Sequence, residues 1–168
     1  SAIVSGHFKP RERLIETDLE PRFNCSRTVI RDVFKILESK GLIHIQPYKG
    51  AQVSDLSPQE IEDIYFLRSH LERIAAKPII ENITQYEIQK LKIRAERAES
   101  ALRSGGPNMV QEDQEFHRFL FQTTRNTYLN NFIEQLRLKS YIVSFNAWIQ
   151  PDRIEQSVKE HKEIITAI

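Results

Sequence analysis

Cysteine, glycine and long apolar runs are all scarce in this sequence. Its 168 residues include one cysteine, Cys25, and five glycines. A single thiol excludes an internal disulfide, so we interpret Cys25 as a small apolar side chain in a turn. No stretch approaches the ~20 apolar residues of a membrane-spanning helix, and no signal peptide is visible. These absences predict a soluble, cytoplasmic protein that has no membrane partner.

Net charge is also small. Lysine and arginine number 24 against 23 aspartates and glutamates, which gives a net charge of +1. This excludes a strongly basic coat for nucleic acid, although a whole-chain sum can hide a local basic face. The 40% of hydrophobic and 28% of charged residues are typical of a globular protein with a real core. The length allows one large domain or two small ones.

The first part of the chain predicts a short helix. Thr17 and Glu20 have the spacing of a capping box, with Thr17 as the N-cap. Proline is tolerated in the first turn of a helix, so Pro21 agrees with a helix that starts at Thr17. We expect this helix to end around residues 23–24.

A second helix is predicted between Ser26, a favourable N-cap, and Gly41, which is placed where helices commonly end. One face has apolar residues at i, i+3, i+4 and i+7, namely Ile30, Val33, Phe34 and Leu37. The opposite arc is polar and contains Arg27, Thr28, Arg31 and Lys35. Two short strands in LIHIQ and AQVS, joined by a turn at PYKG, follow this helix.

Two helices joined by a tight turn and followed by a β-hairpin make a winged helix-turn-helix. In that motif the second helix enters the DNA major groove with its N-terminus first. Arg27, Thr28 and Arg31 would then meet phosphates and base edges, and the arginine fork suits the O6 and N7 atoms of guanine. The plainer alternative is a solvated helix face with three cations. The hairpin directly after the helix favours DNA binding.

After a short linker at residues 55–58, the rest of the sequence has the pattern of helices. Pro78 is expected to kink or end the first of them, and Thr84 with Glu87 forms a capping box for the second. The lengths and short loops predict an antiparallel all-α bundle over residues 58–168. The predicted fold class is therefore mostly α, with a winged helix-turn-helix domain over residues 1–55. The last helix has no stop signal, so we expect the C-terminal domain to be truncated.

One predicted bundle helix carries Asp113 and His117 among apolar residues. Four residues make about one helical turn, so both side chains share the face that Phe116 and Leu120 flank. Buried carboxylates and imidazoles are costly unless they are paired or bind something. From the residues alone, a hydrogen-bonded Asp–His pair is the more common arrangement. His161 lies too far along the chain for spacing to connect it with this pair.

The stretch HFKPRERLIETDLEPRFNCSRTVIRDVFKILESKGLIHIQPYKGAQV resembles the DNA-binding domain of GntR-type bacterial transcription regulators. The resemblance implies that Arg27, Thr28 and Arg31 contact DNA from the second helix. It also implies that the wing tip, Lys49 and Gly50, approaches the minor groove. The sequence departs from the family pattern, which has Gly, Pro, Leu and Arg at the positions of Arg11, Val29, Phe34 and Lys49.

The segments LRSHLERIAA, DQEFHRFL, RNTYL and EHKEIITAI resemble, in this order, the FCD ligand-binding domain of the FadR-like branch of the same family. This resemblance implies that Asp113, His117 and His161 bind a divalent metal, which would be zinc, nickel or manganese. A further histidine ligand would follow beyond the last residue. The metal would anchor a small carboxylic acid as effector, and Arg68 and Asn126 would add contacts to it.

These assignments have alternatives. Arg68 is equally a surface arginine beside Glu72, and Asn126 equally stabilises the turn before Tyr128. A metal-free regulator that senses an apolar or acyl ligand is the second interpretation, and the fatty-acid sensor for which the branch is named lacks the metal triad. A metal-dependent hydrolase is the third, but no general base or nucleophile motif accompanies the three residues.

The resulting hypothesis is a ligand-responsive transcription regulator and not an enzyme. Winged-helix proteins of this kind usually bind near-palindromic operator DNA as homodimers. An effector in the bundle would favour one relative placement of the two DNA-reading helices.

Overall fold

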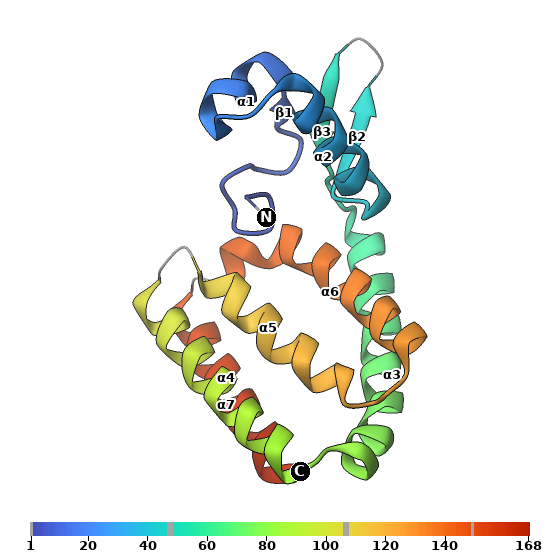
Figure 1. Cartoon of the computed structure of the whole chain (residues 1–168), viewed down its shortest axis with the longest axis vertical. Helices are drawn as coiled ribbons and strands as arrows, with labels where there is room; N and C mark the ends of the chain where they lie inside the picture. Colours follow the sequence, from blue (N-terminus) through green and yellow to red (C-terminus); the bar gives the residue numbers. More distant parts are fainter. Residues whose placement is uncertain (1, 47–48, 106–107, 149) are drawn as a thin grey trace.

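A winged unit and a bundle of helices lie at opposite ends of the long axis of the molecule (Figure 1). The structure is a computed structural model that describes residues 2–46, 49–105, 108–148 and 150–168. The winged unit contains β1 (Arg13–Leu14), α1 (Glu16–Phe23), α2 (Arg27–Ser39), β2 (Ile43–Gln46) and β3 (Gly50–Val53). The bundle contains α3 (Pro58–Asn82), α4 (Gln85–Ser104), α5 (Met109–Gln122), α6 (Thr127–Trp148) and α7 (Pro151–Ala167). The predicted fold class, a winged helix-turn-helix followed by helices, is confirmed.

The wing belongs to a three-stranded sheet and not to a lone hairpin. Its strands are antiparallel in the order β1–β3–β2, and Leu14 of β1 lies opposite Ala51 of β3. Strand β1 was not predicted, because two residues are too few to show the period-two alternation of a strand. The turn predicted at PYKG lies partly outside the described residues, since these omit positions 47 and 48.

The predicted capping box at the start of α1 is wrong. The N-cap is Ile15, and no side chain caps this helix end, so Thr17 lies inside the first turn. Pairing of β1 with β3 holds the chain extended up to Leu14, and the helix therefore begins directly after the strand. Pro21 consequently lies inside α1, beyond its first turn. The predicted end of the helix at residues 23–24 is correct.

The buried stripe of α2 is narrower than predicted. Ile30 and Phe34 are buried and Leu37 is half-buried, whereas Val33 is 44% exposed. The described neighbours of α2 are α1 and β2, and they cover one side of the helix, so a side chain at the edge of the stripe stays in solvent. Ser26 is the N-cap residue, as predicted, but its side chain makes no capping hydrogen bond.

Two glycines shape the connections in the winged unit. Gly41 follows α2 with a φ of +68°, a left-handed conformation that ends the helix as predicted. Gly50 begins β3 with a φ of +84°, and a Cβ atom at this position would lie 2.6 Å from the carbonyl oxygen of Leu14. The close pairing of β1 with β3 therefore requires glycine at position 50.

Capping boxes define the starts of the first two bundle helices. The predicted box of Thr84 and Glu87 is present at α4. Ser57, which belongs to the predicted linker, forms another box with Glu60 at the start of α3. Each box satisfies two backbone groups at a helix start, so both helices begin at sharply defined positions.

Pro78 was expected to kink or end the first bundle helix, and helix α3 does not end there. It continues to Asn82, whose side-chain amide donates to the carbonyl oxygen of Pro78 at 2.8 Å. Proline removes the donor that the carbonyl of Ile74 would otherwise accept. Ile74 is 61% exposed and lies on the solvent side of the helix, where this loss is tolerated.

In the bundle, α5 packs against α4 and α6, α6 packs against α3, and α7 packs against α4 (Figure 1). The break predicted at Gln150–Pro151 is present, with Pro151 as the first residue of α7. The loop predicted at SGGPN lies partly outside the described residues, which omit positions 106 and 107. The centre of the bundle is apolar and is formed by Leu91, Phe116, Leu120, Phe121 and Ile133, among others.

A second apolar cluster connects the two units. It contains Ile3 and Val4 from the N-terminal turns together with Leu102, Met109 and Val158 from the bundle. The N-terminus lies between the winged unit and the bundle (Figure 1). The two units therefore share a continuous core that includes the N-terminal segment.

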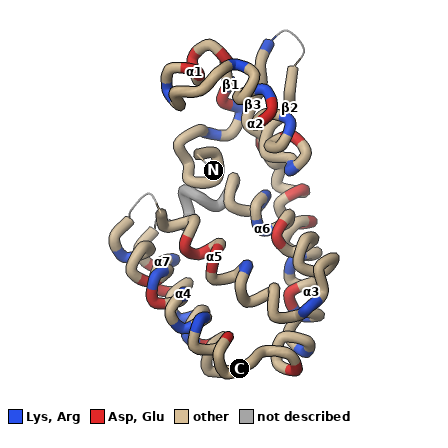
Figure 2. Tube along the Cα trace, in the orientation of Figure 1, with Lys and Arg blue, Asp and Glu red and all other residues tan. Residues whose placement is uncertain are grey.

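Charges of both signs are distributed over both units (Figure 2), in agreement with the small net charge. In the described part of the chain, no helix combines the length and the apolar character needed to cross a membrane.

Candidate functional site

Four of the five residues predicted to contact DNA line one hollow of the winged unit. Arg27 is the first residue of α2 and Arg31 lies one turn later, with side chains that are 52% and 61% exposed. A hollow beside α2 is lined by both arginines and by Lys49 and Gly50 of the wing. Thr28 is exposed on the same helix. The fold thus brings helix and wing residues to one surface.

Glu16, at the start of α1, contacts both arginines. The Nε atom of Arg31 donates to Oε1 of Glu16 at 2.8 Å, and Nε of Arg27 lies 2.9 Å from Oε2. The hydrogen bond from Arg31 lowers the pKa of Glu16 below its usual range, which keeps the carboxylate charged at neutral pH. Glu16 was not among the predicted site residues, because it and the arginines come from different helices, and spacing along the sequence does not show such a contact.

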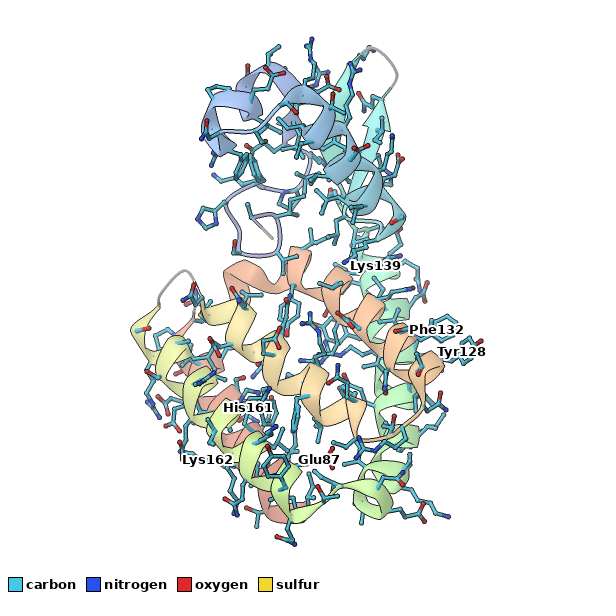
Figure 3. The ribbon with its side chains drawn as sticks, in the orientation of Figure 1. Glu87, Tyr128, Phe132, Lys139, His161 and Lys162 are labelled. Carbon is cyan, nitrogen blue, oxygen red and sulfur yellow. The ribbon has the colours of Figure 1, made fainter. Side chains whose placement is uncertain are left out.

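The predicted metal ligands meet inside the bundle. Asp113 and His117 come from α5 and His161 comes from α7, where it lies in the interior (Figure 3). Nε2 of His161 is 3.1 Å from Oδ1 of Asp113 and 3.2 Å from Nε2 of His117, and the third separation, between Nε2 of His117 and Oδ1 of Asp113, is 3.6 Å. Ligands at about 2.1 Å from a tetrahedral ion are about 3.4 Å apart, so the three atoms fit around one metal ion.

Burial and protonation of these groups also suit a metal. Oδ1 of Asp113 is buried and has no aligned hydrogen-bond donor among the described residues. Burial lowers the pKa of His117 to about 4, so its imidazole is neutral at pH 7 and can offer a lone pair. Burial alone would raise the pKa of Asp113, but His117, His161 and Arg137 outweigh it and hold the pKa well below its usual range.

Arg137 of α6 is a buried charge that the sequence analysis missed. Its Nη2 atom donates to Oδ2 of Asp113 at 3.4 Å and to the hydroxyl of Tyr141 at 3.3 Å. Tyr141 also donates to Oδ2 of Asp113. The two carboxylate oxygens of Asp113 therefore have different surroundings: Oδ2 faces Arg137 and Tyr141, while Oδ1 faces the two histidines.

The same arginine connects this centre with α3. Nη1 of Arg137 donates to Oε1 of Glu72 at 3.0 Å, and Nε of Arg68 donates to the same oxygen at 2.9 Å. Burial raises the pKa of Glu72, but the charges of Arg137 and Arg68 outweigh this effect and lower it. Arg68 also donates to the hydroxyl of Ser140 at 3.0 Å. The proposed alternative for Arg68, a contact with Glu72, is therefore present.

Arg68 also lies beside the candidate metal ligands. A hollow of about 440 Å³ is lined by residues of α3, α5, α6 and α7, including Arg68, Glu72, His117, Arg137 and Tyr141. A molecule in this hollow would meet an imidazole, three guanidinium groups and three carboxylates.

Comparisons with known proteins agree with both halves of this arrangement. A family model described as bacterial regulatory proteins, gntR family, matches residues 1–53, and the FCD domain model matches residues 63–168. The chain belongs to the GntR family of bacterial regulatory proteins and has an FCD domain. It is a DNA-binding transcription regulator.

Curated relatives of this GntR regulator cover almost the whole chain. It is 28% identical over 168 residues to the uncharacterized HTH-type transcriptional regulator YdhC of Bacillus subtilis, covering 99% of this chain and 75% of that protein. It is 30% identical over 166 residues to the Nta operon transcriptional regulator of Aminobacter aminovorans, covering 98% and 77%. Among solved structures, E. coli McbR/YncC matches with a TM-score of 0.80 at 20% identity, covering 99% and 80%, which supports the fold.

Asn126 of the GntR regulator lies away from the candidate metal centre. Its side-chain oxygen accepts from the backbone N–H of Leu129 at 3.0 Å, at the start of α6. This contact corresponds to the alternative in which the residue stabilises the turn before Tyr128.

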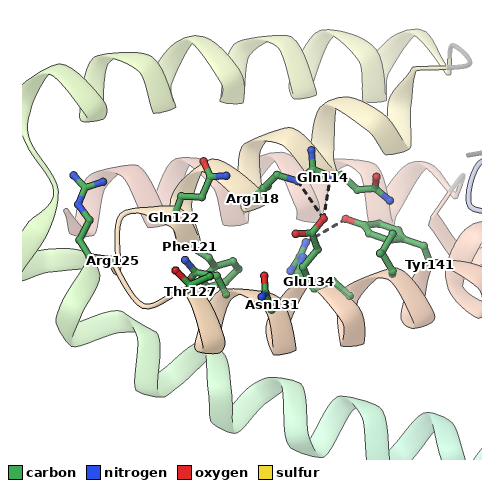
Figure 4. Close-up of a pocket in the computed structure, with 12 residues that line it drawn as sticks. Gln114, Arg118, Phe121, Gln122, Arg125, Thr127, Asn131, Glu134 and Tyr141 are labelled. Atoms are coloured by element: carbon green, nitrogen blue, oxygen red, sulfur yellow. Dashed lines mark hydrogen bonds and ion pairs between the residues drawn. The ribbon is translucent and has the colours of Figure 1, made fainter. Parts of the chain in front are cut away.

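A further hollow is lined mainly by residues of α5 and α6, and Arg137 and Tyr141 belong to its lining as well (Figure 4). Its charged lining residues are already paired: Arg118 lies 3.1 Å from Glu134, and Arg125 lies 2.8 Å from Glu87. The arginines of the hollow beside His117 are paired as well, so what distinguishes that hollow is that a candidate metal ligand lines it.

Proposed function

We propose that this GntR regulator binds operator DNA through α2 and the wing and responds to a small carboxylic acid held by a divalent metal. The observation that carries the metal part is the spacing of three donor atoms, from Asp113, His117 and His161, which lie 3.1–3.6 Å from one another. Two imidazoles and one carboxylate suit zinc or nickel and also admit manganese.

The proposal that the protein binds DNA rests on exposed cations at the N-terminal end of α2, which is the end that enters the major groove in this motif. Arg27 and Arg31 lie in its first two turns, and Lys49 and Gly50 lie beside them on the wing. We assign base and phosphate contacts to the arginines and Thr28, and minor-groove contacts to the wing.

Local charge favours a carboxylate as the effector. Arg68, Arg137 and Arg153 contribute three positive charges to the lining of the hollow at His117, and Glu72, Glu160 and Glu163 contribute three negative ones, so with Asp113 these seven groups sum to −1. A divalent cation would change this sum to +1. Carboxylate oxygens are natural partners for such a cation. Asn126 is the weaker effector candidate, because its side chain already caps α6.

We further propose that two chains associate through α3 and α6. These helices pack side by side and carry exposed apolar side chains, among them Phe66 (63% exposed) and Ile74 on α3 and Tyr128 and Phe132 (58% exposed) on α6. Tyr128 and Phe132 project away from the body of the bundle (Figure 3). A second copy that covers these side chains would bury apolar surface and place two winged units on one DNA molecule.

Elemental analysis tests the metal site. Untagged wild-type protein, purified without chelator, should contain about one zinc, nickel or manganese ion per chain. The variant H117A should lose it, because one of three donor atoms is removed. H70A is the matched control, since His70 is exposed on α3 and contacts the carbonyl of Phe66. A wild-type protein without metal, or an equal metal content in H117A, would contradict the proposal.

A metal-free regulator that senses an apolar or acyl ligand is the second candidate. In this candidate the three residues would be a polar group inside the bundle, where His161 Nε2 and Asp113 Oδ1 lie 3.1 Å apart without an aligned hydrogen bond. Absence of metal from the wild-type protein would support this candidate and would direct ligand screening to apolar acids and acyl compounds.

A further inference from the structure

Glu16 occupies a position that the DNA-reading role of α2 alone does not explain. A carboxylate repels DNA phosphates, yet this one lies within the surface that carries Arg27, Arg31 and Lys49. Its side chain is only 17% exposed, whereas those of the two arginines are 52% and 61% exposed. The acid is therefore better shielded from solvent than the cations, and it lines the same hollow between α2 and the wing.

The contact geometry leaves the outer edges of both arginines free of Glu16. Each carboxylate oxygen receives one Nε atom, Oε1 from Arg31 and Oε2 from Arg27. The guanidinium fork has five N–H donors: Nε–H and one parallel Nη–H face a partner at Nε, and the end-on pair, one N–H from each Nη group, points away from it. These Nη groups can still form the paired bonds to guanine O6 and N7. Glu20 adds a weaker contact to Arg27 at 3.5 Å.

Such a contact affects specific and non-specific binding differently. A free arginine side chain samples many rotamers, and fixing it during binding reduces affinity. An arginine already held at Nε loses less freedom when it meets a base edge in the correct position. On DNA without that base, the half-buried carboxylate partly neutralises the arginines and weakens their attraction to phosphates.

We propose that Glu16 determines operator specificity by orienting Arg27 and Arg31 for base edges and by limiting their use as phosphate contacts. This inference rests on the proposed role of α2 in DNA binding. Glu16 is a positioning residue, because it acts through the two arginines and its own contacts are with them.

The variant E16Q tests this role. Glutamine has the same shape but lacks the charge, and it has one acceptor oxygen in place of two. D18N is the matched control, because Asp18 lies on the same turn of α1 and its side chain contacts Thr17 and not the arginines. The specific probe is a duplex enriched by the full-length wild-type protein from a random double-stranded pool, and the non-specific probe is a shuffled duplex of equal composition.

In wild type and D18N we expect the same ratio of specific to non-specific affinity, within about twofold. In E16Q we expect this ratio to fall at least about tenfold, chiefly because non-specific binding becomes tighter. The salt dependence of non-specific binding should steepen by about 1–2 in slope, since each released arginine can neutralise one phosphate. Circular dichroism melting of each variant would show that α1 remains folded.

Equal ratios and salt slopes in E16Q and D18N would overturn the proposal. A uniform loss of affinity in E16Q, with the slope unchanged, would also overturn it, because that result describes a purely structural role. The double variant R27A/R31A separates this failure from a failure of the proposed DNA surface. If that variant binds the enriched duplex as tightly as wild type, α2 is not the reading helix; if it binds at least about tenfold more weakly, the surface is correct and only Glu16 is in question.

Discussion

Arg137 shows at the residue scale how the candidate site is held together. It is 7% exposed and bridges Asp113 of α5 and Glu72 of α3. Burial lowers the pKa of a guanidinium, but Tyr141, Asp113 and Glu72 outweigh this effect and raise it, so Arg137 remains charged. Its role is to compensate two carboxylates and to keep one oxygen of Asp113 directed at the histidines.

Removal of this charge should be costly. In the presence of a chelator, R137A should lower the free energy of unfolding in urea by about 3–5 kcal/mol, because it leaves buried carboxylates uncompensated. R118A is the control: Arg118 is 37% exposed and pairs with Glu115 and Glu134, so about 0–1 kcal/mol is expected. A loss below about 1 kcal/mol for R137A would mean that the buried network contributes little.

Part of this centre was predictable from sequence and part was not. Asp113 and His117 are one turn apart, so a shared face followed from helical geometry. That His161 lies beside them was predicted only from the family resemblance, since 44 residues separate the two histidines. Arg137 gave no signal, because nothing in the sequence around it indicates that its helix turns this side chain inward.

The same sequence signal gave opposite results in two elements. Thr84 and Glu87 form the predicted capping box of α4, whereas the identical spacing at Thr17 and Glu20 does not cap α1. The difference comes from the preceding chain. The short strand β1 pairs with β3 and forces α1 to start one residue before Thr17, and a long-range pairing of this kind leaves no local pattern.

The exposed apolar faces of α3 and α6 lead to a prediction about association. F132D should raise the dissociation constant of the dimer more than about tenfold, because it would place a charge in an apolar contact. Analytical ultracentrifugation over a range of concentrations would measure this. I93D is the control, since Ile93 is 50% exposed on α4, outside the proposed surface. A monomeric wild-type protein, or equal effects of both variants, would argue against the α3–α6 surface.

At the scale of the whole molecule, the hypothesis requires the bundle to influence DNA binding. Metal-loaded protein should change its affinity for the enriched duplex when a suitable small carboxylic acid is added. A tenfold change corresponds to about 1.4 kcal/mol of coupling, and it cannot exceed the difference in effector affinity between the two states. Fluorescence anisotropy with a panel of organic and sugar acids would detect it.

Two controls make this titration specific. The neutral amide of each active acid should have no effect, since it lacks the charge that the metal and Arg68 would bind. The variant H117A should bind the duplex but should not respond to the acid. A response that persists in H117A would show that the effector acts elsewhere in the molecule.

The connection between the two units was the least predictable feature of the fold. The sequence indicates which residues of the N-terminal turns are apolar, but no periodicity shows that Ile3 and Val4 share a core with the bundle. Domain patterns are local, whereas this core joins segments from both ends of the described chain.

This shared core has a consequence for synthesis on the ribosome. Ile3 and Val4 leave the exit tunnel well before Val158, which belongs to the same cluster and lies about 155 positions later. At about 5–20 residues per second, translation of that interval takes about 8–30 s. The strands of the wing can pair within this time, while the apolar N-terminal turns wait for their last partners. Nascent chains of this regulator therefore pass through a long period in which they offer a binding site to chaperones.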